Sequence, residues 1–581
     1  TLFHNKKRNT NNKVMTSYGT TNSINDGPDD HQDLGDLPHE NTPLLHTDSF
    51  EEQTNTPVKN IEITPSTRRY MYRDPNQPKR ERNYSQYSTA SSRTRVGSLI
   101  SSVTHTISTS VRKLQKSVGF LQGFTLIVGI LIGSGVFISP SLVMQSTHDA
   151  GISFVLWFAC GLIALGGSLC YVELGCAIKR AGGNYAYIQE AYGDLPAFLC
   201  CWTVAFIVDP AGVAAITLTL GTYVIKPFEE WIEPNPWYPK CIAAGVILMI
   251  ALVNCWSVRA ATRAQTLFTF AQILSVVFVV CIGIWQLAKE GTGHITHGMF
   301  NVTSFTFKDV GPLGAALYNG LWAYDGWALV SNVTEEMTNL ERNLFLSIIT
   351  GIPFVICCYL LVNLSFLAAL SVEQIANSPA VAVTFIDKTL GHNAAFAMPI
   401  LVALSCYGAA NGTVFACGRL SLAAGREGHL PELLSMIHKK RHTPIPAVIM
   451  TSIISLVMLI PDASGLETLI SFFNFSCWFI YGLSLFAVVV LRIRQPDLHR
   501  PYKVWIITPI LMTLISLFLV IVPFLQNPIN PLIASGMIAM GIPFYFVFVY
   551  FEPRHPTALI AARRRFKKRT QKLFNLAPCT M

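Results

Sequence analysis

Long apolar stretches repeat along most of this chain, and they decide which folds it can adopt. Between Gly119 and Phe551 about twelve such stretches follow one another, each close to the roughly 20 residues that a helix needs to cross a bilayer. The stretches are continuous rather than alternating, which favours helices, because a spanning helix satisfies its own backbone hydrogen bonds in lipid. The sequence therefore predicts an all-α, polytopic membrane protein.

The apolar stretches also divide the chain into three parts. Residues 1–110 are polar and predict a disordered cytoplasmic N-terminal tail, 111–551 predict the transmembrane domain, and 552–581 predict a basic cytoplasmic C-terminal tail. The predicted spans are 119–144, 152–177, 196–226, 238–257, 264–288, 310–337, 344–370, 394–422, 446–461, 466–491, 504–525 and 531–551.

Charge is scarce and unevenly distributed. Only 13% of the residues are charged, against roughly 25% in a soluble protein, and the formal net charge is +9. The basic residues gather in alternate loops and in the run Arg563–Arg569, so the positive-inside rule places both termini in the cytoplasm. This distribution explains the positive charge through membrane lipid and leaves no role for nucleic acid.

No constellation in the chain indicates enzyme chemistry. The 14 cysteines predict no disulfide framework, since all but Cys579 fall in or beside predicted spans. Several histidines lie in loops without metal-ligand spacing or a nucleophile–base arrangement, namely His148, His392, His429, His438 and His442. We expect a protein that is no enzyme and needs no cofactor or metal.

Glycines interrupt the first predicted span. Gly-Ser-Gly at 133–135 weakens the helix, because Gly costs about 1 kcal/mol relative to Ala in a helix interior. If the helix unwinds there, the N-terminus of its second half would favour a carboxylate, whereas the alternative is close packing through small residues. The candidate substrate-binding residues of this span are Ile132, Gly133, Ser134, Gly135 and Val136.

A carboxylate interrupts the sixth predicted span. Asp325 stands beside Gly326 between aromatic residues, and an intramembrane carboxylate is a functional hypothesis by default, with a structural hydrogen-bonding role as the alternative. Trp322 could cap a bound ligand as a gate, or be an ordinary packing residue. The candidate substrate-binding residues of this span are Trp322, Ala323, Tyr324, Asp325 and Trp327.

The two interrupted spans are the first of two sets of five. Corresponding broken helices in two halves are typical of inverted-repeat transporters with a substrate site at the bilayer midplane, and the last two spans then lie outside the repeat. In this picture an α-carboxylate rests on the N–H groups near Ser134, an α-ammonium contacts the carbonyls near Ile132 and Trp322, and Asp325 receives a cationic side chain. A channel fits less well, because no ring of filter residues is visible.

At these motifs the sequence resembles the L-type amino acid transporters, the light subunits of the heteromeric amino acid exchangers in the amino acid–polyamine–organocation superfamily. The likeness covers about residues 115–555, and the sixth-span motif Leu321–Trp327 is most similar to the b-zero-plus branch, which exchanges cationic amino acids and cystine for neutral ones. Other matching blocks are 132–137, 170–175, 182–187, 254–259, 333–337, 380–383 and 425–431. The resemblance implies a LeuT-type 5+5 fold, sodium-independent exchange, Trp322 as the gate and Asp325 as the side-chain discriminator.

The chain departs from this family pattern at several positions. The light subunits carry a Cys in the loop after the third span that bonds to a heavy-chain glycoprotein, whereas the loop 227–236 has none. Gln272 stands where the family usually has a Lys, at the place of a sodium ion in sodium-coupled relatives. The other departures are Ala328 in place of an Asn, and Leu340 and Phe345 in place of prolines.

Several alternatives remain open from the sequence. Exchange, uniport and amino acid sensing without transport all fit the motifs. The resemblance implies the plasma membrane, but Glu40–Leu45 resembles an acidic dileucine signal for endosomal or lysosomal sorting. A glycosylation sequon, Asn301-Val302-Thr303, falls in a loop expected outside the cell.

Overall fold

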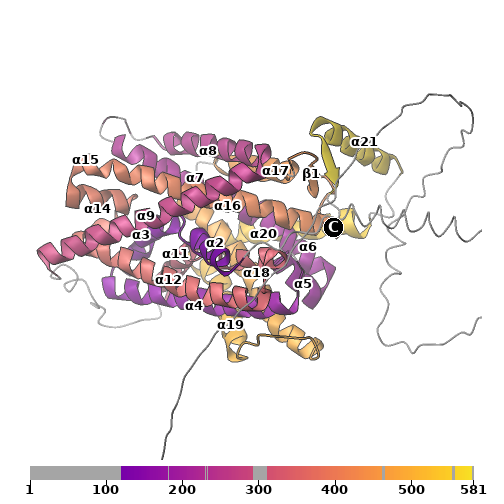
Figure 1. Ribbon diagram of the computed structural model, residues 1–581, viewed down its shortest axis with the longest axis horizontal. Coiled ribbons are helices and arrows are strands. Elements are labelled where there is room, and N and C mark those ends of the chain that lie inside the picture. The colour runs from indigo at the N-terminus through magenta and orange to yellow at the C-terminus, as the bar shows by residue number, and fades with distance from the viewer. Residues whose placement is uncertain are drawn as a thin grey trace, which may run out of the picture. The chain divides into compact units, whose positions relative to one another are not determined.

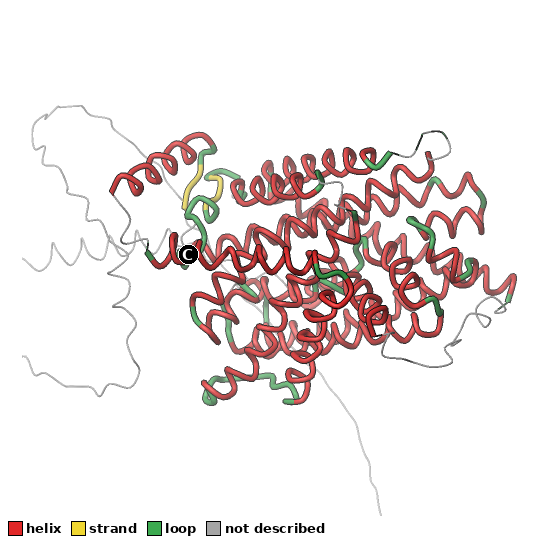
Figure 2. Tube along the Cα trace, turned by 180° about the vertical axis from the view of Figure 1, so that it is seen from behind, coloured by secondary structure: helices red, strands yellow, loops and turns green. Residues whose placement is uncertain are grey.

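The computed structural model describes residues 119–578 except 181, 229–230, 232, 234, 292–309, 442, 461–464 and 552–556. Almost all of it is helical, with short connecting loops (Figures 1 and 2). The predicted N-terminal tail, the sorting motif Glu40–Leu45 and the sequon at Asn301 lie outside the described residues.

The first set of spans runs from α2 to α9. Its elements are α2 (Phe120–Leu131), α3 (Gly135–Thr147), α4 (Ala150–Ala177), α5 (Asn184–Tyr192), α6 (Asp194–Thr203), the π-helical turn η2 (Val204–Val208), α7 (Asp209–Ile225), the 3-10 turn η3 (Lys226–Phe228), α8 (Trp237–Trp256) and α9 (Val258–Glu290).

The second set and the remaining elements follow. They are α11 (Val310–Ala323), the 3-10 helix η5 (Trp327–Glu336), α12 (Leu340–Ala369), α13 (Val372–Ala376), α14 (Val381–Leu390), α15 (His392–Ala395), α16 (Ala397–Arg426), β1 (Met436–His438), α17 (Ile445–Met458), α18 (Leu466–Arg494), α19 (Ile507–Gln526), α20 (Ile529–Tyr545), the π-helical η6 (Phe546–Tyr550), α21 (Thr557–Leu573) and β2 (Leu576–Pro578).

The helices have the length and composition of membrane spans. Within the described residues, nine are long and apolar enough to cross a bilayer, and α2 with α3 adds a tenth span that is bent by 44°. The other two predicted spans are shorter helices: α11 ends at a break, and α17 has 14 residues, about 21 Å against a hydrocarbon core of about 30 Å. The prediction of an all-α, polytopic membrane protein is confirmed.

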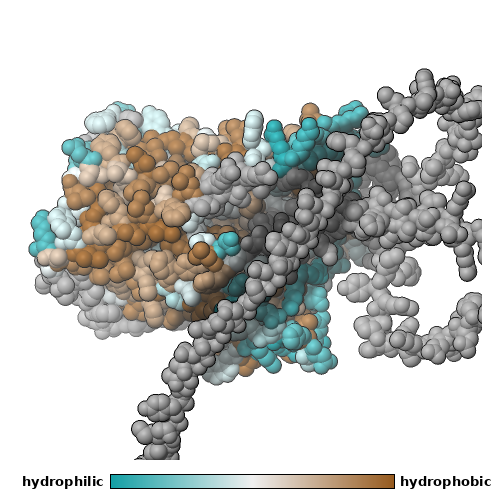
Figure 3. All heavy atoms as spheres, in the orientation of Figure 1, coloured by the Kyte–Doolittle hydropathy of each residue, from teal (hydrophilic) through white to brown (hydrophobic). Residues whose placement is uncertain are grey.

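The outer faces of the helices are apolar. Large hydrophobic side chains are exposed there, such as Phe270 and Leu274 on α9 and Leu514 on α19. Figure 3 shows a broad hydrophobic surface over the helices, with hydrophilic residues gathered towards its ends. An exposed apolar surface of this extent needs lipid as its solvent.

Corresponding helices of the two sets pack against one another. α3 contacts α11, α4 contacts α12, α7 contacts α16, and α8 contacts α17. Four of five counterparts therefore meet in pairs, which is the arrangement that a 5+5 repeat around a common centre gives. α19 and α20 follow the repeat and both pack against α18.

The described part of the C-terminal tail is folded. α21 is followed by β2, which pairs antiparallel with β1 in the register Met436↔Pro578, Ile437↔Ala577 and His438↔Leu576. Leu576 is buried with Met436 and Ile445 in a small apolar cluster. The end of the chain is thereby joined to the loop between α16 and α17, which the basic composition of the tail did not indicate.

Candidate substrate-binding site

The first broken span unwinds at the predicted glycines. The N–H of Ile132 donates to Val128 O at 2.9 Å, and the N–H of Gly133 turns back to Leu131 O at 2.7 Å, which ends α2. α3 begins at Gly135, directly after Ser134, and no side chain caps its N-terminus. Because the first N–H groups of any helix lack intrahelical acceptors, α3 presents free donors and the positive end of its dipole at the break.

The second broken span unwinds at the predicted Asp. α11 ends at Ala323, the N–H of Asp325 donates to Trp322 O at 3.2 Å, and Gly326 adopts a φ of 106° before η5 begins. A side chain at this φ would be strained, so the Gly allows the turn. α11 therefore ends with its carbonyl groups and its negative dipole end at the break.

The two breaks lie against each other. A Cβ added to Gly135 would stand 2.4 Å from Ala323 Cα, and one added to Gly326 would stand 2.2 Å from Ile130 Cγ2. The hydroxyl of Tyr359, on α12, lies 2.5 Å from Leu131 O and 2.8 Å from Ala323 O, the last carbonyls of α2 and α11. One buried side chain thus connects both helix ends.

A cavity of about 120 Å³ opens between the breaks and the helices α7, α16 and α18. A buried water needs roughly 10–15 Å³ of such space, so a small organic molecule can fit. Its lining includes Gly133, Ser134, Gly135, Asn184, Val204, Val208, Asp209, Ile216, Trp322, Ala323, Asp325, Thr413, Phe473, Cys477 and Tyr481.

The structure brings part of the predicted site together. Six of the ten candidate substrate-binding residues line the cavity: Gly133, Ser134, Gly135, Trp322, Ala323 and Asp325. The other four are buried around it but are not among its lining residues: Ile132, Val136, Tyr324 and Trp327. Their burial indicates that they support the breaks from outside.

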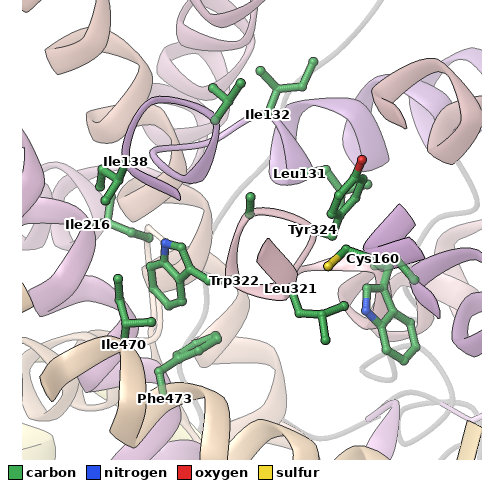
Figure 4. Close-up of a cluster of buried hydrophobic side chains, with 14 of the residues drawn as sticks. Leu131, Ile132, Ile138, Cys160, Ile216, Leu321, Trp322, Tyr324, Ile470 and Phe473 are labelled. Atoms are coloured by element: carbon green, nitrogen blue, oxygen red, sulfur yellow. The ribbon is translucent and has the colours of Figure 1, made fainter. Parts of the chain in front are cut away.

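The side chains of Trp322, near the end of α11, and Tyr324, just after it, point in opposite directions. Figure 4 shows Trp322 beside Ile216 and Phe473, and Tyr324 on the other side near Leu131. The rings of Trp322 and Phe473 meet edge to face, 4.7 Å apart at 85°. The indole of Trp322 is 6% exposed, and its Nε1 has no hydrogen-bond partner in the described part of the chain.

Two carboxylates face the cavity. Oδ1 of Asp325 accepts a 2.7 Å hydrogen bond from the Tyr481 hydroxyl on α18. Asp209 lies on α7, is 7% exposed, and has one oxygen, Oδ2, without a partner among the described residues. None of the described residues that line the cavity is a Lys, Arg or His, so the site carries acidic groups and helix ends but no basic side chain.

Residues 118–549 match the family described as "Amino acid permease". The chain belongs to this family. The match confirms the sequence resemblance, and it identifies a member of a transporter family rather than an enzyme.

Three relatives show how much of the chain is shared. The chain is 41% identical to human "b(0,+)-type amino acid transporter 1" over 76% of its own length and 89% of the relative's. It is 38% identical to human "Cystine/glutamate transporter" over 76% of its own length and 87% of the relative's. It is 37% identical to mouse "Large neutral amino acids transporter small subunit 2" over 76% of its own length and 82% of the relative's.

Gln272, the candidate coupling position, lies behind the cavity rather than in its lining. It is fully buried on α9, and its Nε2 donates to Ser405 O on α16 at 3.1 Å. Its Oε1 has no partner within the described residues. The residue therefore connects two spans of this permease without a charge.

Sequence reasoning missed the cavity-lining residues on α5, α7 and α18. Asp209 carried the same signal as Asp325, a carboxylate within an apolar span, and could have been found by it. Asn184 begins α5 and accepts from Ser484 at 3.5 Å, while Phe473 and Tyr481 sit in ordinary apolar sequence on α18. Only the packing of α18 against the breaks reveals those two.

Proposed function

We propose that this protein is a sodium-independent amino acid antiporter that works by alternating access. The observation that carries the proposal is the pairing of opposite helix ends at one cavity, the uncapped N-terminus of α3 and the C-terminus of α11. The first favours a carboxylate and the second an ammonium group. A zwitterion such as an α-amino acid matches both.

The substrates proposed are neutral amino acids together with cationic amino acids or cystine. The names of the relatives support this range, since they include a b(0,+)-type amino acid transporter, a cystine/glutamate transporter and a large neutral amino acids transporter. In this proposal Trp322 closes over the ligand as the gate, and Asp325 discriminates between side chains. The backbone at 132–136 and the turn at 322–327 hold the common part of the substrate.

Uniport and sensing without transport are the competing functions. Gln272 supports uniport as the alternative, because an uncharged residue occupies the position where the family usually has a Lys. A sensor would use the same cavity for binding and would show no flux.

We further propose the plasma membrane as the location, with both termini in the cytoplasm, and endosomal or lysosomal membrane as the alternative. One relative is named as a small subunit, which supports a heavy-chain glycoprotein as partner. The loop 227–236 has no Cys, so the partner would bind here without the covalent link.

Uptake into liposomes tests the proposal. The purified chain is reconstituted alone in sodium-free buffer, and uptake of labelled arginine and leucine is measured into vesicles that are empty or preloaded with unlabelled leucine. Exchange predicts uptake only into loaded vesicles. Equal uptake into empty vesicles would establish uniport, and binding without uptake into either would support the sensor.

A further inference from the structure

Asp209 is a buried carboxyl group at a cavity whose described lining holds no Lys, Arg or His. Its side chain is more than nine-tenths buried, and Oδ2 has no hydrogen-bond partner among the described residues. The Cys417 thiol is a polar neighbour of this carboxyl, and it lies 2.9 Å from the Thr451 hydroxyl. A thiol is a weak donor and supplies no positive charge.

The backbone around Asp209 is unusual in the same place. η2 is a π-helical turn, and it ends where the N–H of Asp209 donates to Val204 O. Such turns are rare, and they occur frequently at functional sites. Val204, Val208 and Asp209 all line the cavity, so this turn faces the space where a ligand would bind.

No described residue that lines the cavity carries a positive charge that could pair with Asp209. The second carboxylate of the cavity, Asp325, has the same charge and is already bonded to Tyr481. Among the described residues, the titratable groups that interact with Asp209 or line the cavity with it are Cys417 on α16, Cys477 and Tyr481 on α18, and Asp325. The titratable residues of α8, which also packs on α7, are Tyr238, Lys240, Cys241 and Cys255, and none of them lines the cavity.

An ionised carboxylate that is buried without a positive partner is strongly unfavourable, so Asp209 either takes up a proton or pairs with a positive charge on a ligand. We propose that Asp209 is a cation subsite of the substrate cavity, which holds the positively charged side chain of a cationic amino acid and holds a proton when the substrate is neutral. This proposal rests on the proposed amino acid transport. It adds a second group for side-chain charge recognition, on α7, beside Asp325, which accepts a hydrogen bond from Tyr481.

The test compares Asp209→Asn with the parent protein in the full-length chain. Asn keeps the shape and removes the charge. Asp387→Asn on α14 is the matched control, because that carboxylate is about half exposed and does not line the cavity. The KM values of arginine and leucine are measured in proteoliposomes over about pH 5.5 to 8, the range in which a buried carboxylate can titrate.

The positive charge beside Asp209 can come from the substrate's side chain or from a proton, and these two sources predict different results. If the substrate supplies it, Asp209→Asn raises the arginine KM about tenfold or more and leaves the leucine KM within about twofold, a difference of about 1.4 kcal/mol. If the proton supplies it, leucine uptake by the parent protein depends on pH and that dependence disappears in Asp209→Asn. Either result supports the subsite, and both together support the whole proposal.

An equal rise in the KM of arginine and of leucine in Asp209→Asn at every pH, or KM values unchanged from the parent protein, would overturn the proposal. A selective rise in the arginine KM in Asp325→Asn but not in Asp209→Asn would also overturn it. Asp209→Glu keeps the charge and should keep the preference for arginine, which separates lost charge from faulty folding.

A second measurement separates this inference from the proposed exchange. Stabilisation of the purified protein against heat by arginine and by leucine needs no flux. Selective loss of the arginine effect in Asp209→Asn supports the subsite even if the parent protein shows no uptake, whereas an unchanged arginine effect contradicts it.

Discussion

Contacts of single atoms set the distance between the two broken spans. Gly135 at the start of α3 lies against the backbone of Ala323 at the end of α11, so that even a methyl group would stand 2.4 Å from Ala323 Cα. From α12, Tyr359 reaches the last carbonyls of α2 and α11 and joins these two C-terminal ends. The approach of α3 to α11 keeps opposite helix dipoles at one cavity.

Gly135→Ala should disrupt this approach. Overpacking of this kind costs about 1–3 kcal/mol, and the displaced helix end should weaken substrate binding at least about tenfold. Binding of labelled leucine and apparent unfolding temperature are measured for Gly135→Ala and for Gly245→Ala on α8, where an added Cβ meets nothing within 4 Å. Equal behaviour of the two variants would show that the close approach is unimportant.

Tyr359→Phe should destabilise the site without a change of shape. It leaves the carbonyls of Leu131 and Ala323 without their shared donor, and an unsatisfied buried acceptor costs about 1–3 kcal/mol. We expect a lower unfolding temperature and weaker leucine binding than in Tyr550→Phe, where the ring is exposed. Unchanged stability in Tyr359→Phe would contradict the bridging role.

At the scale of elements, buried polar groups join the helix ends at one side of the bundle. Glu173 near the end of α4 accepts from Arg492 Nε at 2.8 Å and from the backbone N–H of Val504 at 2.8 Å, and Arg500 Nε lies 3.7 Å away. These contacts fix α4 to the end of α18 and to the connection that leads into α19. Glu173 is 1% exposed, so these contacts are shielded from water.

Glu173→Gln should therefore lower stability strongly. Removal of one partner from a buried ion pair costs about 3–5 kcal/mol, because the other charge is left uncompensated. The matched control is Glu341→Gln, since Glu341 pairs with Lys179 at 3.1 Å on the surface, where ion pairs contribute little. Similar unfolding temperatures for the two variants would show that the Glu173 contacts are not stabilising.

A second junction contains a titratable group outside the spans. His429, in the loop after α16, is buried, its Nδ1 lies 2.9 Å from the Tyr185 hydroxyl on α5, and its Nε2 lies 3.8 Å from Asp194 at the start of α6. Burial lowers the pKa of His429, although the carboxylates of Asp194 and Glu427 oppose this shift. The neutral imidazole is therefore the form that the fold prefers.

The sign of the pH dependence follows from that preference. With a pKa lower in the folded state than its ordinary value of about 6.5, the contribution of His429 is fully present above that value and is lost as pH falls below it. The unfolding temperature of the parent protein should fall more steeply between about pH 7 and 5.5 than that of His429→Gln. In His499→Gln, at an exposed histidine, the unfolding temperature should depend on pH as it does in the parent protein. The same pH dependence in His429→Gln would contradict the role given to His429.

At the scale of the whole molecule, much of this architecture could be predicted from the sequence. Continuous apolar runs predicted the order and approximate limits of the long helices, because their length is set by the bilayer. Gly133–Gly135 and Asp325–Gly326 marked both breaks, since glycines and a carboxylate contradict an uninterrupted apolar helix.

Other features depend on contacts distant in sequence. Phe473 and Tyr481 reach the cavity only because α18 packs near the breaks, and no local pattern distinguishes them from core residues. The pairing of β1 with β2 involves three residues in each strand, too few for a periodic signal. The place of Gln272 behind the cavity follows from the packing of α9 against α16, which its own span does not encode.

In the proposed function, the cavity between the two breaks binds an amino acid by its charged ends. An experimental structure of the full chain with saturating leucine tests this binding mode. We predict ligand density with its carboxylate at the N–H groups of 134–136 and its ammonium at the end of α11, next to Trp322. Density at another place, or an empty cavity in a protein that is binding leucine under the same conditions, would contradict this binding mode.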